Sequence, residues 1–466
     1  MGPAGRRAPG PSHPMIAALL LSCLSAPVCP EFQELQGPAR PAQAPEGSSE
    51  DAEEPARRAP NVILILADDL SYTDLGFTGG TEARTPHLDR LAKRSVRFDQ
   101  AYVNSPICAP SRAGLMTGRY PHRFGYVNYT GLPVQMEQHD VGVPTDERLM
   151  GQPFQEAGYR TGIVGKWHLG VNPRFRPLQR GFDEFFGHLG GGHDYFEWDQ
   201  ELGGPIWRDD EPVDGEGYLT NVFADEACAF VRRHHERPFF LFLSFNAVHT
   251  PLQVPDEYVQ VFADVESGVR RRVLAMGHCM DEGIGRLLAT LEELDLSEDT
   301  VVLFLNDNGS SLGAGGNGSL RNGKHRVYEG GIRVPMLLSW PGHLEPGVYS
   351  PMVSAMDVLP TLLSAAGLPP AEGIDGVDLL PYLRGEAEGQ PHEILYWRLK
   401  HMNAVREADM KLFMSGDLKD PIKLELFDLA ADPGETTNLA DEQPELVRHL
   451  RERFMAWRTQ MPKPLF

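Results

Sequence analysis

The sequence predicts an α/β fold in which a large, mostly parallel sheet is flanked by helices. Short apolar runs, each ending in a loop and followed by a helical pattern, are typical of buried parallel strands. The four runs are NVILILA (61–67), TGIVG (161–165), FFLFLSF (239–245) and TVVLFL (300–305). In an amphipathic segment after the first run, Thr85 is an expected N-cap, Pro86 occupies the first turn, and Leu88, Leu91 and Ala92 share one face. Strands that alternate with such helices favour a sheet covered on both sides.

A smaller antiparallel sheet with a packed helix is expected at the C-terminus. After about residue 385 the pattern changes to short segments and then to a final helix. The segments are EILYWRL (393–399), VREADMKLFM (405–414) and LELFDL (424–429), and the helix runs from 444 to about 459. We therefore expect a main domain over 61–385 and a C-terminal subdomain over 386–466, which either borders a cleft of the main domain or serves packing only.

The N-terminal region differs from the rest of the chain. In residues 1–29, Arg6 and Arg7 precede an apolar run (15–21) and small residues, an order that resembles a secretory signal; a disordered tail is the alternative. The run is too short to span a bilayer, so no stable membrane insertion is expected. Residues 30–60 are rich in Pro, Ala and Glu, which predicts a disordered linker. We expect an exported protein, periplasmic or extracellular, with the lysosome or ER lumen as the alternative.

The charge distribution favours a small anionic ligand. The chain has a net charge of −22, yet the segments 101–136, 158–182 and 308–328 contain basic residues and no Asp or Glu. An acidic protein with a local basic pocket can bind a small anion while it repels bulk polyanions. Nucleic acid is therefore not an expected partner.

Polar side chains follow all four predicted strands. They are Asp68 and Asp69, Lys166 and His168, Asn246 and His249, and Asp307 and Asn308. In open α/β sheets, functional groups gather beyond the carboxyl ends of the strands, although any one of these residues could instead form a cap, a turn or a solvated surface. Three carboxylates and an amide are hard oxygen ligands, which suit Ca²⁺ or Mg²⁺ better than Zn²⁺.

Cys108 is one of only five cysteines and lies just before Arg112 at an expected helix start. A thiolate there would be stabilised, which allows a cysteine nucleophile. A disulfide with Cys228 or Cys279 is the structural alternative, because an exported protein rarely keeps a reactive free thiol.

The segment CAPSRAGLMTG (108–118) resembles the C-x-P-S-R-x-x-x-L/M-T-G signature of the formylglycine-dependent sulfatases, which belong to the alkaline-phosphatase-like superfamily. GYRTGIVGKWHLG (158–170) matches a second signature of that family, and the resemblance covers residues 61 to about 460. The segments RYPHRFG (119–125) and RGFDEFFGHLGGGHDYF (180–196) most resemble the sequences of bacterial polysaccharide and aryl sulfatases. The resemblance implies hydrolysis of sulfate monoesters, with a sulfated sugar or an aryl sulfate as substrate.

The resemblance also implies a modified residue. A separate maturation enzyme would oxidise Cys108 to formylglycine, and Pro110 and Arg112 would belong to the tag that this enzyme reads. The hydrated aldehyde has one hydroxyl that attacks sulfur and a second that expels the sulfate when the carbonyl re-forms. A serine or a free thiol has no second hydroxyl.

The roles of the remaining site residues follow from the same resemblance. Ca²⁺ would be held by Asp68, Asp69, Asp307, Asn308 and the converted residue 108. Arg112 would steady the diol, and Lys166 and Lys324 would bind the sulfate. His249 would also bind the sulfate and, alone or together with Lys324, would protonate the leaving alcohol. His168 would accept a proton when the aldehyde returns.

Three other functions stay open at this point. They are a phosphonate or phosphate ester hydrolase of the same superfamily, an inactive protein that binds sulfated glycans, and a hydrolase that uses unmodified Cys108. Candidate sugar-binding residues are His193, Asp194 and Arg333, together with a possible aromatic platform of Phe185, Tyr195, Phe196 and Trp198.

Overall fold

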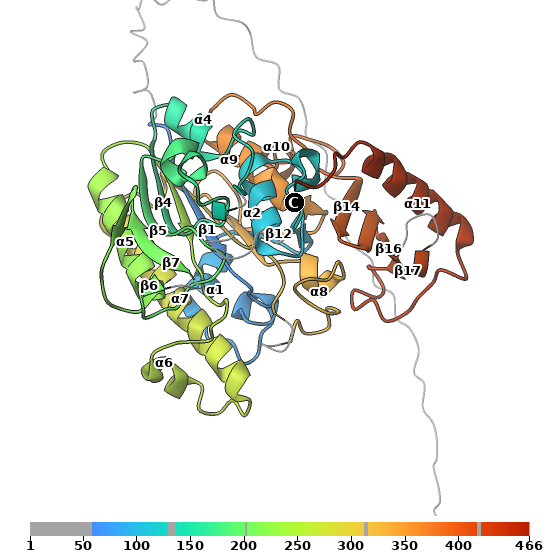
Figure 1. Cartoon of the computed structure of the whole chain (residues 1–466), viewed down its shortest axis with the longest axis horizontal. Helices are drawn as coiled ribbons and strands as arrows, with labels where there is room; N and C mark the ends of the chain where they lie inside the picture. The colour runs from blue at the N-terminus through green and yellow to red at the C-terminus, as the bar shows by residue number, and fades with distance from the viewer. Residues whose placement is uncertain are drawn as a thin grey trace, which may run out of the picture. The chain divides into compact units, whose positions relative to one another are not determined.

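The computed structural model contains an 11-stranded mixed sheet at the centre of the main domain (Figure 1). It describes residues 58–128, 137–138, 140–200, 203–311, 316–416 and 421–465, so the expected signal peptide and most of the expected linker lie outside the described residues. In spatial order the strands are β12 (Gly347–Tyr349), β2 (Val96–Phe98), β11 (Met336–Ser339), β10 (Thr300–Asn306), β1 (Asn61–Ala67), β9 (Phe239–Ser244), β4 (Arg160–Lys166), β5 (Glu184–His188), β7 (Gly204–Arg208) and β6 (Asp199–Gln200), with β8 (Glu211–Val213) paired to β7. A separate two-stranded sheet joins β3 (Ala101–Tyr102) and β13 (Val353–Ser354).

The four strands expected from the apolar runs are confirmed and lie at the centre of the sheet. Strands β10, β1, β9, β4 and β5 run parallel to one another. Towards the edges, β11, β2 and β7 pair in the antiparallel direction with a neighbour, so the sheet is mostly parallel only in its core. Every residue of β1 is buried, which explains why its sequence is a continuous apolar run.

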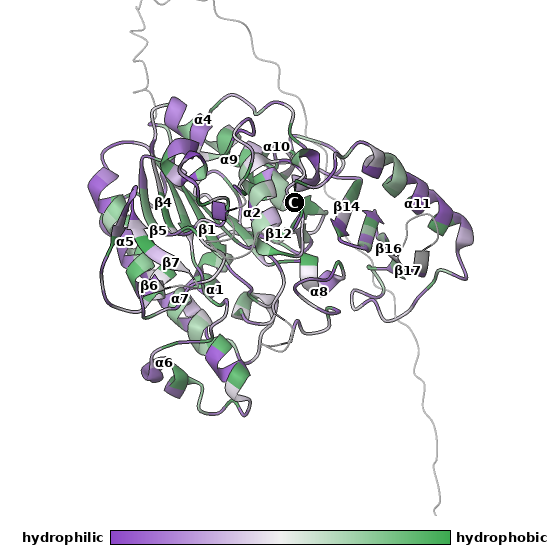
Figure 2. Ribbon diagram, viewed as in Figure 1, coloured by the Kyte–Doolittle hydropathy of each residue, from purple (hydrophilic) through white to green (hydrophobic). Residues whose placement is uncertain are grey.

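Helices cover both faces of this sheet (Figure 1). Alternate residues of β1 belong to two different apolar clusters, one on each face. The helices of the first cluster are α2 (Cys108–Thr117), α4 (Gly151–Glu156), α9 (Val358–Ala365) and α10 (Leu380–Leu383), and those of the second are α1 (Pro86–Lys93), α5 (Leu219–His234) and α7 (Gly268–Glu293). Two further short helices are α6 (Asp256–Val261) and α8 (Glu329–Ile332). In Figure 2 the central strands are green, as expected for a sheet buried on both sides.

Helix α1 begins as expected, with Pro86 at its first position. The side chain of Thr85 makes no capping hydrogen bond within the helix; its Oγ1 instead accepts a hydrogen bond from the backbone N–H of Gly76 at 2.9 Å. Thr85 is therefore the N-cap residue, as expected, but its side chain does not cap the backbone N–H groups of the helix.

The C-terminal sheet is confirmed as a four-stranded antiparallel meander packed against a helix. Its elements are β14 (Ile394–Leu399), β15 (Met402–Glu407), β16 (Met410–Gly416), β17 (Pro421–Asp428) and α11 (Pro444–Thr459). The segment expected as one strand over 405–414 contains parts of β15 and β16. The turn between them is Ala408–Asp409, with φ of +50° at Ala408; Asp409 is its only typical turn residue, so the turn signal in the sequence was weak.

Specific contacts join this C-terminal sheet to the main domain. The indole Nε1 of Trp397 donates a hydrogen bond of 2.7 Å to the backbone oxygen of Val103. Lys411 forms a buried ion pair of 2.8 Å with Glu329 of α8. The domain boundary at residue 385 stays a prediction, because the described residues of both parts group into one compact unit.

Candidate active site

The acidic groups of the site follow two neighbouring strands. Asp68 and Asp69 come directly after β1, and Asp307 and Asn308 come directly after β10. These strands pair in parallel with Ala67 opposite Asn306, so their carboxyl ends place the four side chains together. All four residues are buried. Asp69 has φ of +62°, a conformation that non-glycine residues adopt mainly where the surrounding structure imposes it.

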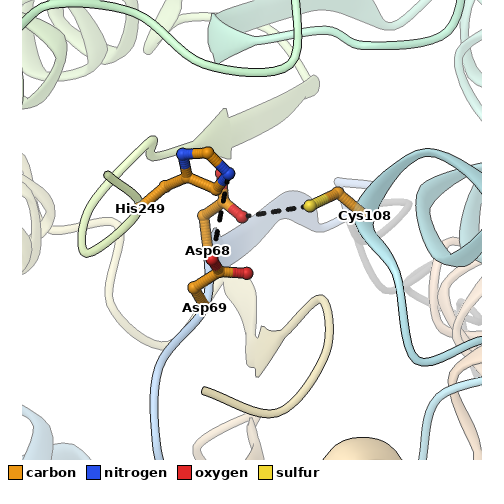
Figure 3. Close-up of side chains that lie close together, drawn as sticks. All are labelled: Asp68, Asp69, Cys108 and His249. Atoms are coloured by element: carbon orange, nitrogen blue, oxygen red, sulfur yellow. Dashed lines mark hydrogen bonds and ion pairs between the residues drawn. The ribbon is translucent and has the colours of Figure 1, made fainter. Parts of the chain in front are cut away.

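The cluster offers oxygen ligands suited to a hard cation. The side-chain amide of Asn308 donates to Oδ1 of Asp69 at 2.7 Å, which leaves Oδ1 of Asn308 buried without a hydrogen-bond partner among the described residues. One ligand atom each from Asp68, Asp69, Cys108 and His249 lies within 4.8 Å of the others (Figure 3). An unsatisfied amide oxygen beside three carboxylates fits Ca²⁺ or Mg²⁺.

Three buried cations lie against these carboxylates. Nζ of Lys166 lies 2.5 Å from Oδ2 of Asp68, and Nζ of Lys324 lies 2.8 Å from Oδ2 of Asp69. Arg112 Nε donates to Oδ2 of Asp307 at 2.9 Å. The predicted strand-end residues Asp68, Asp69, Lys166 and Asp307 therefore do lie together, whereas Arg112 comes from α2 and Lys324 from the loop before α8.

The electrostatic balance differs between two of the carboxylates. Burial opposes ionisation of Asp68, but Lys166, His249 and Arg112 outweigh it and hold the pKa of Asp68 well below its usual value. Burial and the charge of Asp68 raise the pKa of Asp307 to about 7, although Arg112 opposes this shift. A bound cation would add positive charge at the place where the carboxylates repel each other.

Cys108 is the first residue of α2, as its sequence context predicts. Its thiol points towards Asp68, with Sγ donating to Oδ1 at 3.6 Å (Figure 3). Burial raises the pKa of the Cys108 thiol to about 12, although Lys166 and Lys324 act in the opposite direction. An unmodified Cys108 is therefore protonated near neutral pH and is a poor nucleophile.

The structural alternative, a disulfide between Cys108 and Cys228 or Cys279, is excluded. All three cysteines are buried free thiols. Cys228 and Cys279 belong to α5 and α7, whereas α2 packs on the other face of the sheet, so the sheet itself separates them from Cys108.

Arg112 is fixed by several groups at the floor of the site. Its Nη1 donates to Oγ of Ser244 at 2.6 Å and to the backbone oxygen of Lys166 at 3.3 Å, and its Nη2 lies 3.6 Å from Oδ2 of Asp68. The side chain is fully buried. These contacts hold the guanidinium between α2 and the ends of β4, β9 and β10.

His249 is oriented by its neighbours in the loop after β9. Its Nδ1 lies 2.7 Å from the backbone oxygen of Thr250, which accepts the Nδ1 hydrogen, and its Nε2 lies 3.8 Å from Oδ2 of Asp69 (Figure 3). The hydroxyl of Tyr195 donates to the backbone oxygens of Asn246 and His249, at 2.6 and 2.8 Å. Tyr195 is thus a positioning residue for this loop, a role that the sequence did not indicate.

His168 is buried in an unusual backbone conformation, with φ of +59°. Burial, reinforced by the charges of Lys166 and Arg112, holds the pKa of His168 well below its usual value. Its imidazole is therefore neutral and able to accept a proton.

Substitution of Gly191 by alanine is expected to displace the His168 ring. A Cβ on Gly191 would lie 2.6 Å from both Cε1 and Nε2 of His168, which is too close for an undisturbed ring. We expect kcat to fall by about 100-fold, the cost of misplacing a group with the proton-accepting role that the resemblance implies for His168. Steady-state kinetics would measure this against Gly268→Ala, where a Cβ meets nothing within 4 Å. Equal kcat values for the two variants would show that the ring position is not critical.

A cavity of about 820 Å³ opens above these groups. It is lined by Ile107, Cys108, Ala109, His168, Gly191, Gly192, His249, Thr250, Ser311, Lys324, His325, Arg326, Leu399, Lys400, His401 and Met402. The turn between β14 and β15 supplies Leu399 to Met402, so the C-terminal sheet borders the cleft. The sequence analysis missed Ser311, whose Oγ donates to Oδ2 of Asp69 at 2.7 Å.

Several other candidates lie in structural networks rather than in the cavity wall. Both ring nitrogens of His193 face backbone oxygens, Asp194 accepts backbone hydrogen bonds in its own turn, and Arg333 Nε donates to the backbone oxygen of Asp99. The expected aromatic platform is also wrong. Its members Phe185 and Tyr195 are buried, and none of the four proposed aromatic residues lines the cavity.

The acid-free basic segments contribute fewer cations to the cavity than expected. Arg119 and Arg123 are paired with acids from elsewhere in the chain, Glu147 and Asp375. Arg160 is paired with Glu184 in the same way. Local absence of acids in the sequence was therefore a poor guide to unpaired charge in the fold.

In the described part of the chain, no helix combines the length and apolar character needed to cross a bilayer.

Comparisons with known proteins agree with this site. The Sulfatase family model matches residues 60–368, and a model of the N-sulphoglucosamine sulphohydrolase C-terminal region matches residues 322–460. N-acetylgalactosamine-6-sulfatase of Mus musculus is 36% identical over 382 residues, which cover 76% of this chain and 72% of that protein. Arylsulfatase A of Homo sapiens is 33% identical over 455 residues, covering 85% and 87%.

A solved structure shares both sequence and fold. Ps i-CgsB in complex with k-i-k-neocarrahexaose has a TM-score of 0.82 and 34% identity, and the match covers 88% of this chain and 95% of that chain. The family model spans most of the main domain, and the relatives are named as sulfatases. This chain therefore belongs to the sulfatase family and is a sulfuric ester hydrolase.

Proposed function

We propose that this sulfatase hydrolyses sulfate esters of carbohydrate, with residue 108 converted to formylglycine and Ca²⁺ bound beside it. The observation that carries the proposal is the position of Cys108, at the first residue of α2, within the carboxylate cluster and at the floor of the cavity. A carbohydrate substrate is supported by the relative named N-acetylgalactosamine-6-sulfatase and by the neocarrahexaose bound to Ps i-CgsB.

The chemistry of residue 108 favours modification over use of the thiol. The raised pKa of Cys108, about 12, leaves almost no thiolate at neutral pH. A hydrated aldehyde at this position supplies one hydroxyl for attack and a second for release of sulfate. We therefore propose that the chain needs a formylglycine-generating maturation enzyme as a partner. We also propose that the chain is exported.

Ca²⁺ would be held by Asp68, Asp69, Asp307 and Asn308, together with residue 108. When bound, it would polarise the sulfate ester and favour ionisation of a nearby hydroxyl. The buried, unpartnered Oδ1 of Asn308 supports this assignment, because a metal would satisfy that atom.

The side chains around the cluster can bind the sulfate and move protons. Lys166 and Lys324 provide two ammonium groups that neutralise charge on the sulfate oxygens. His249 presents Nε2 towards the cluster. Because its Nδ1 hydrogen is held by Thr250, it can donate a proton from Nε2 to the leaving alcohol only in its doubly protonated form, and the neutral His168 can accept a proton from residue 108. Arg112 holds the carboxylates in place and faces the same site.

The alternatives lead to different results. A phosphate or phosphonate ester hydrolase would prefer a matched phosphate ester over the sulfate ester. An inactive glycan-binding protein would bind sulfated sugars without turnover, but the nucleophile position, both lysines and both histidines are all present.

The test is the mass of tryptic peptide 98–112 from protein made in a host that contains the maturation enzyme. We expect this peptide to be about 18 Da lighter than its cysteine form, because an aldehyde oxygen replaces the SH group and one hydrogen. Hydrolysis of 4-nitrophenyl sulfate by the same preparation should exceed that of 4-nitrophenyl phosphate. An unmodified thiol in protein with full sulfatase activity would refute the proposed nucleophile.

A further inference from the structure

The outer part of the cavity is rich in cations. Arg326 follows Lys324 in the loop before α8, and Lys400 lies in the turn between β14 and β15. We call Arg326 and Lys400 the cationic rim. Among the described residues that line this cavity there is no Asp or Glu and no Phe, Tyr or Trp. Charge rather than aromatic stacking is therefore the main means by which the cavity can hold a sugar.

The rim differs from the cations at the cavity floor. Lys166 and Lys324 are each paired with a carboxylate of the metal cluster. Arg326 has a 3.0 Å hydrogen bond from Nη1 to the backbone oxygen of His325, and neither rim residue has an ion pair with any described carboxylate. No described carboxylate therefore neutralises either side chain, although the net charge of the protein is −22.

The backbone of the rim supports a functional role. Lys400 is the first residue of a two-residue turn, because Leu399 pairs with Met402 across β14 and β15. Its φ is +55°, a conformation in which glycine is favoured at this position of a hairpin. His325, next to Arg326, has φ of +67°. Such conformations are strained for a non-glycine residue, and observed strain of this kind is enriched at ligand-binding sites.

We infer that Arg326 and Lys400 bind a second anionic group of the substrate, distinct from the sulfate that is cleaved. This inference rests on the proposed function and narrows its substrate to saccharides with at least two anionic groups. Arg326 can bind an oxyanion through two parallel N–H donors, and Lys400 adds a flexible ammonium from the facing domain. Either a sulfate or a carboxylate group could bind to these two cations.

The test compares competitors of different charge against hydrolysis of 4-nitrophenyl sulfate. The competitors are inorganic sulfate, a short dextran sulfate oligosaccharide and a carboxymethyl dextran of the same length. For the wild-type protein, we expect the sulfated oligosaccharide to have an inhibition constant at least about 10-fold lower than that of inorganic sulfate, because it fills both anion sites. The inhibition constant of the carboxymethyl dextran shows whether the cationic rim also binds a carboxylate.

The variants Lys400→Met and Arg326→Gln should each raise the inhibition constant of the oligosaccharide by about fivefold, the upper loss expected for one solvent-accessible ionic contact. The inhibition constant of inorganic sulfate should change much less in these variants. Lys93→Met and Arg90→Gln are matched controls, since these exposed residues of α1 carry the same charges outside the cavity. An oligosaccharide constant unchanged in both rim variants, or changed equally in the controls, would overturn the inference.

Calorimetric titration of the same oligosaccharide into the Cys108→Ala protein separates the two proposals. Absence of sulfate ester hydrolysis by protein that contains formylglycine would refute the proposed function alone. Loss of oligosaccharide affinity in the rim variants would still support the second anion site, because that measurement needs no turnover.

Discussion

Replacement of Cys108 by alanine is expected to lower kcat for sulfate esters on the order of 10⁵-fold or more, while substrate affinity changes little. Deletion of a nucleophile removes the covalent route and leaves only the catalysis that comes from binding and electrostatics. The groups proposed to hold sulfate, Lys166, Lys324 and His249, come from other elements and remain in place. Single-turnover kinetics and calorimetric binding of a sulfated ligand measure the two quantities separately.

The matched control for this prediction is Cys228→Ala. Cys228 is also buried, but it lies in α5 and takes no part in the cavity. Its removal should leave kcat within about twofold, since a cysteine in a helix interior acts as a small apolar group. If Cys108→Ala retained more than about 1% of wild-type kcat, another residue would have to be the nucleophile.

The centre of the fold could be predicted from the sequence because its signals are local. Strands β1, β9 and β10 are buried on both faces, so each is a continuous apolar run. Their parallel pairing then follows from the helical segments between them. For the same reason the cluster of Asp68, Asp69, Asp307 and Asn308 was predictable, because ends of adjacent parallel strands meet at one edge.

The outer parts of the site could not be predicted in this way. Lys400 lies more than 290 residues from Cys108 in the chain, and only the docking of the C-terminal sheet brings both to one cavity. Tyr195 was read as part of an aromatic platform, but its hydroxyl reaches the loop of His249 from inside the core. Such placements depend on tertiary packing, which leaves no periodic or motif signal in the sequence.

The contact between the C-terminal sheet and the main domain depends on a buried ion network of Glu329, Lys411 and Glu435. Nζ of Lys411 lies 2.8 Å from a carboxylate oxygen of each glutamate, and the three side chains are fully buried or nearly so. The backbone N–H of Glu329 also donates to Oε2 of Glu435 at 2.7 Å. Lys411 is thus the cation that both carboxylates share, while Arg333, with Nη1 3.8 Å from Oε2, also faces Glu329.

Lys411→Met is expected to lower the free energy of unfolding by about 3–5 kcal/mol, because it leaves two buried carboxylates without their common cation. The control is Lys423→Met in β17, whose side chain is 48% exposed and pairs with Glu425 at 2.9 Å. Loss of that exposed pair should cost less than about 1 kcal/mol. Urea denaturation monitored by tryptophan fluorescence measures both variants.

The double variant Lys411→Met, Glu435→Gln distinguishes charge from packing. If the uncompensated carboxylates cause the loss, neutralising Glu435 should restore part of the stability, since burial already raises the pKa of Glu435 to about 7 against the opposing charge of Lys411. A loss that the second substitution does not reduce would indicate that the methylene chain of Lys411, rather than its charge, stabilises the junction. Because Lys400 belongs to the same sheet, destabilising this junction should also weaken binding of a multiply anionic saccharide before the main domain unfolds.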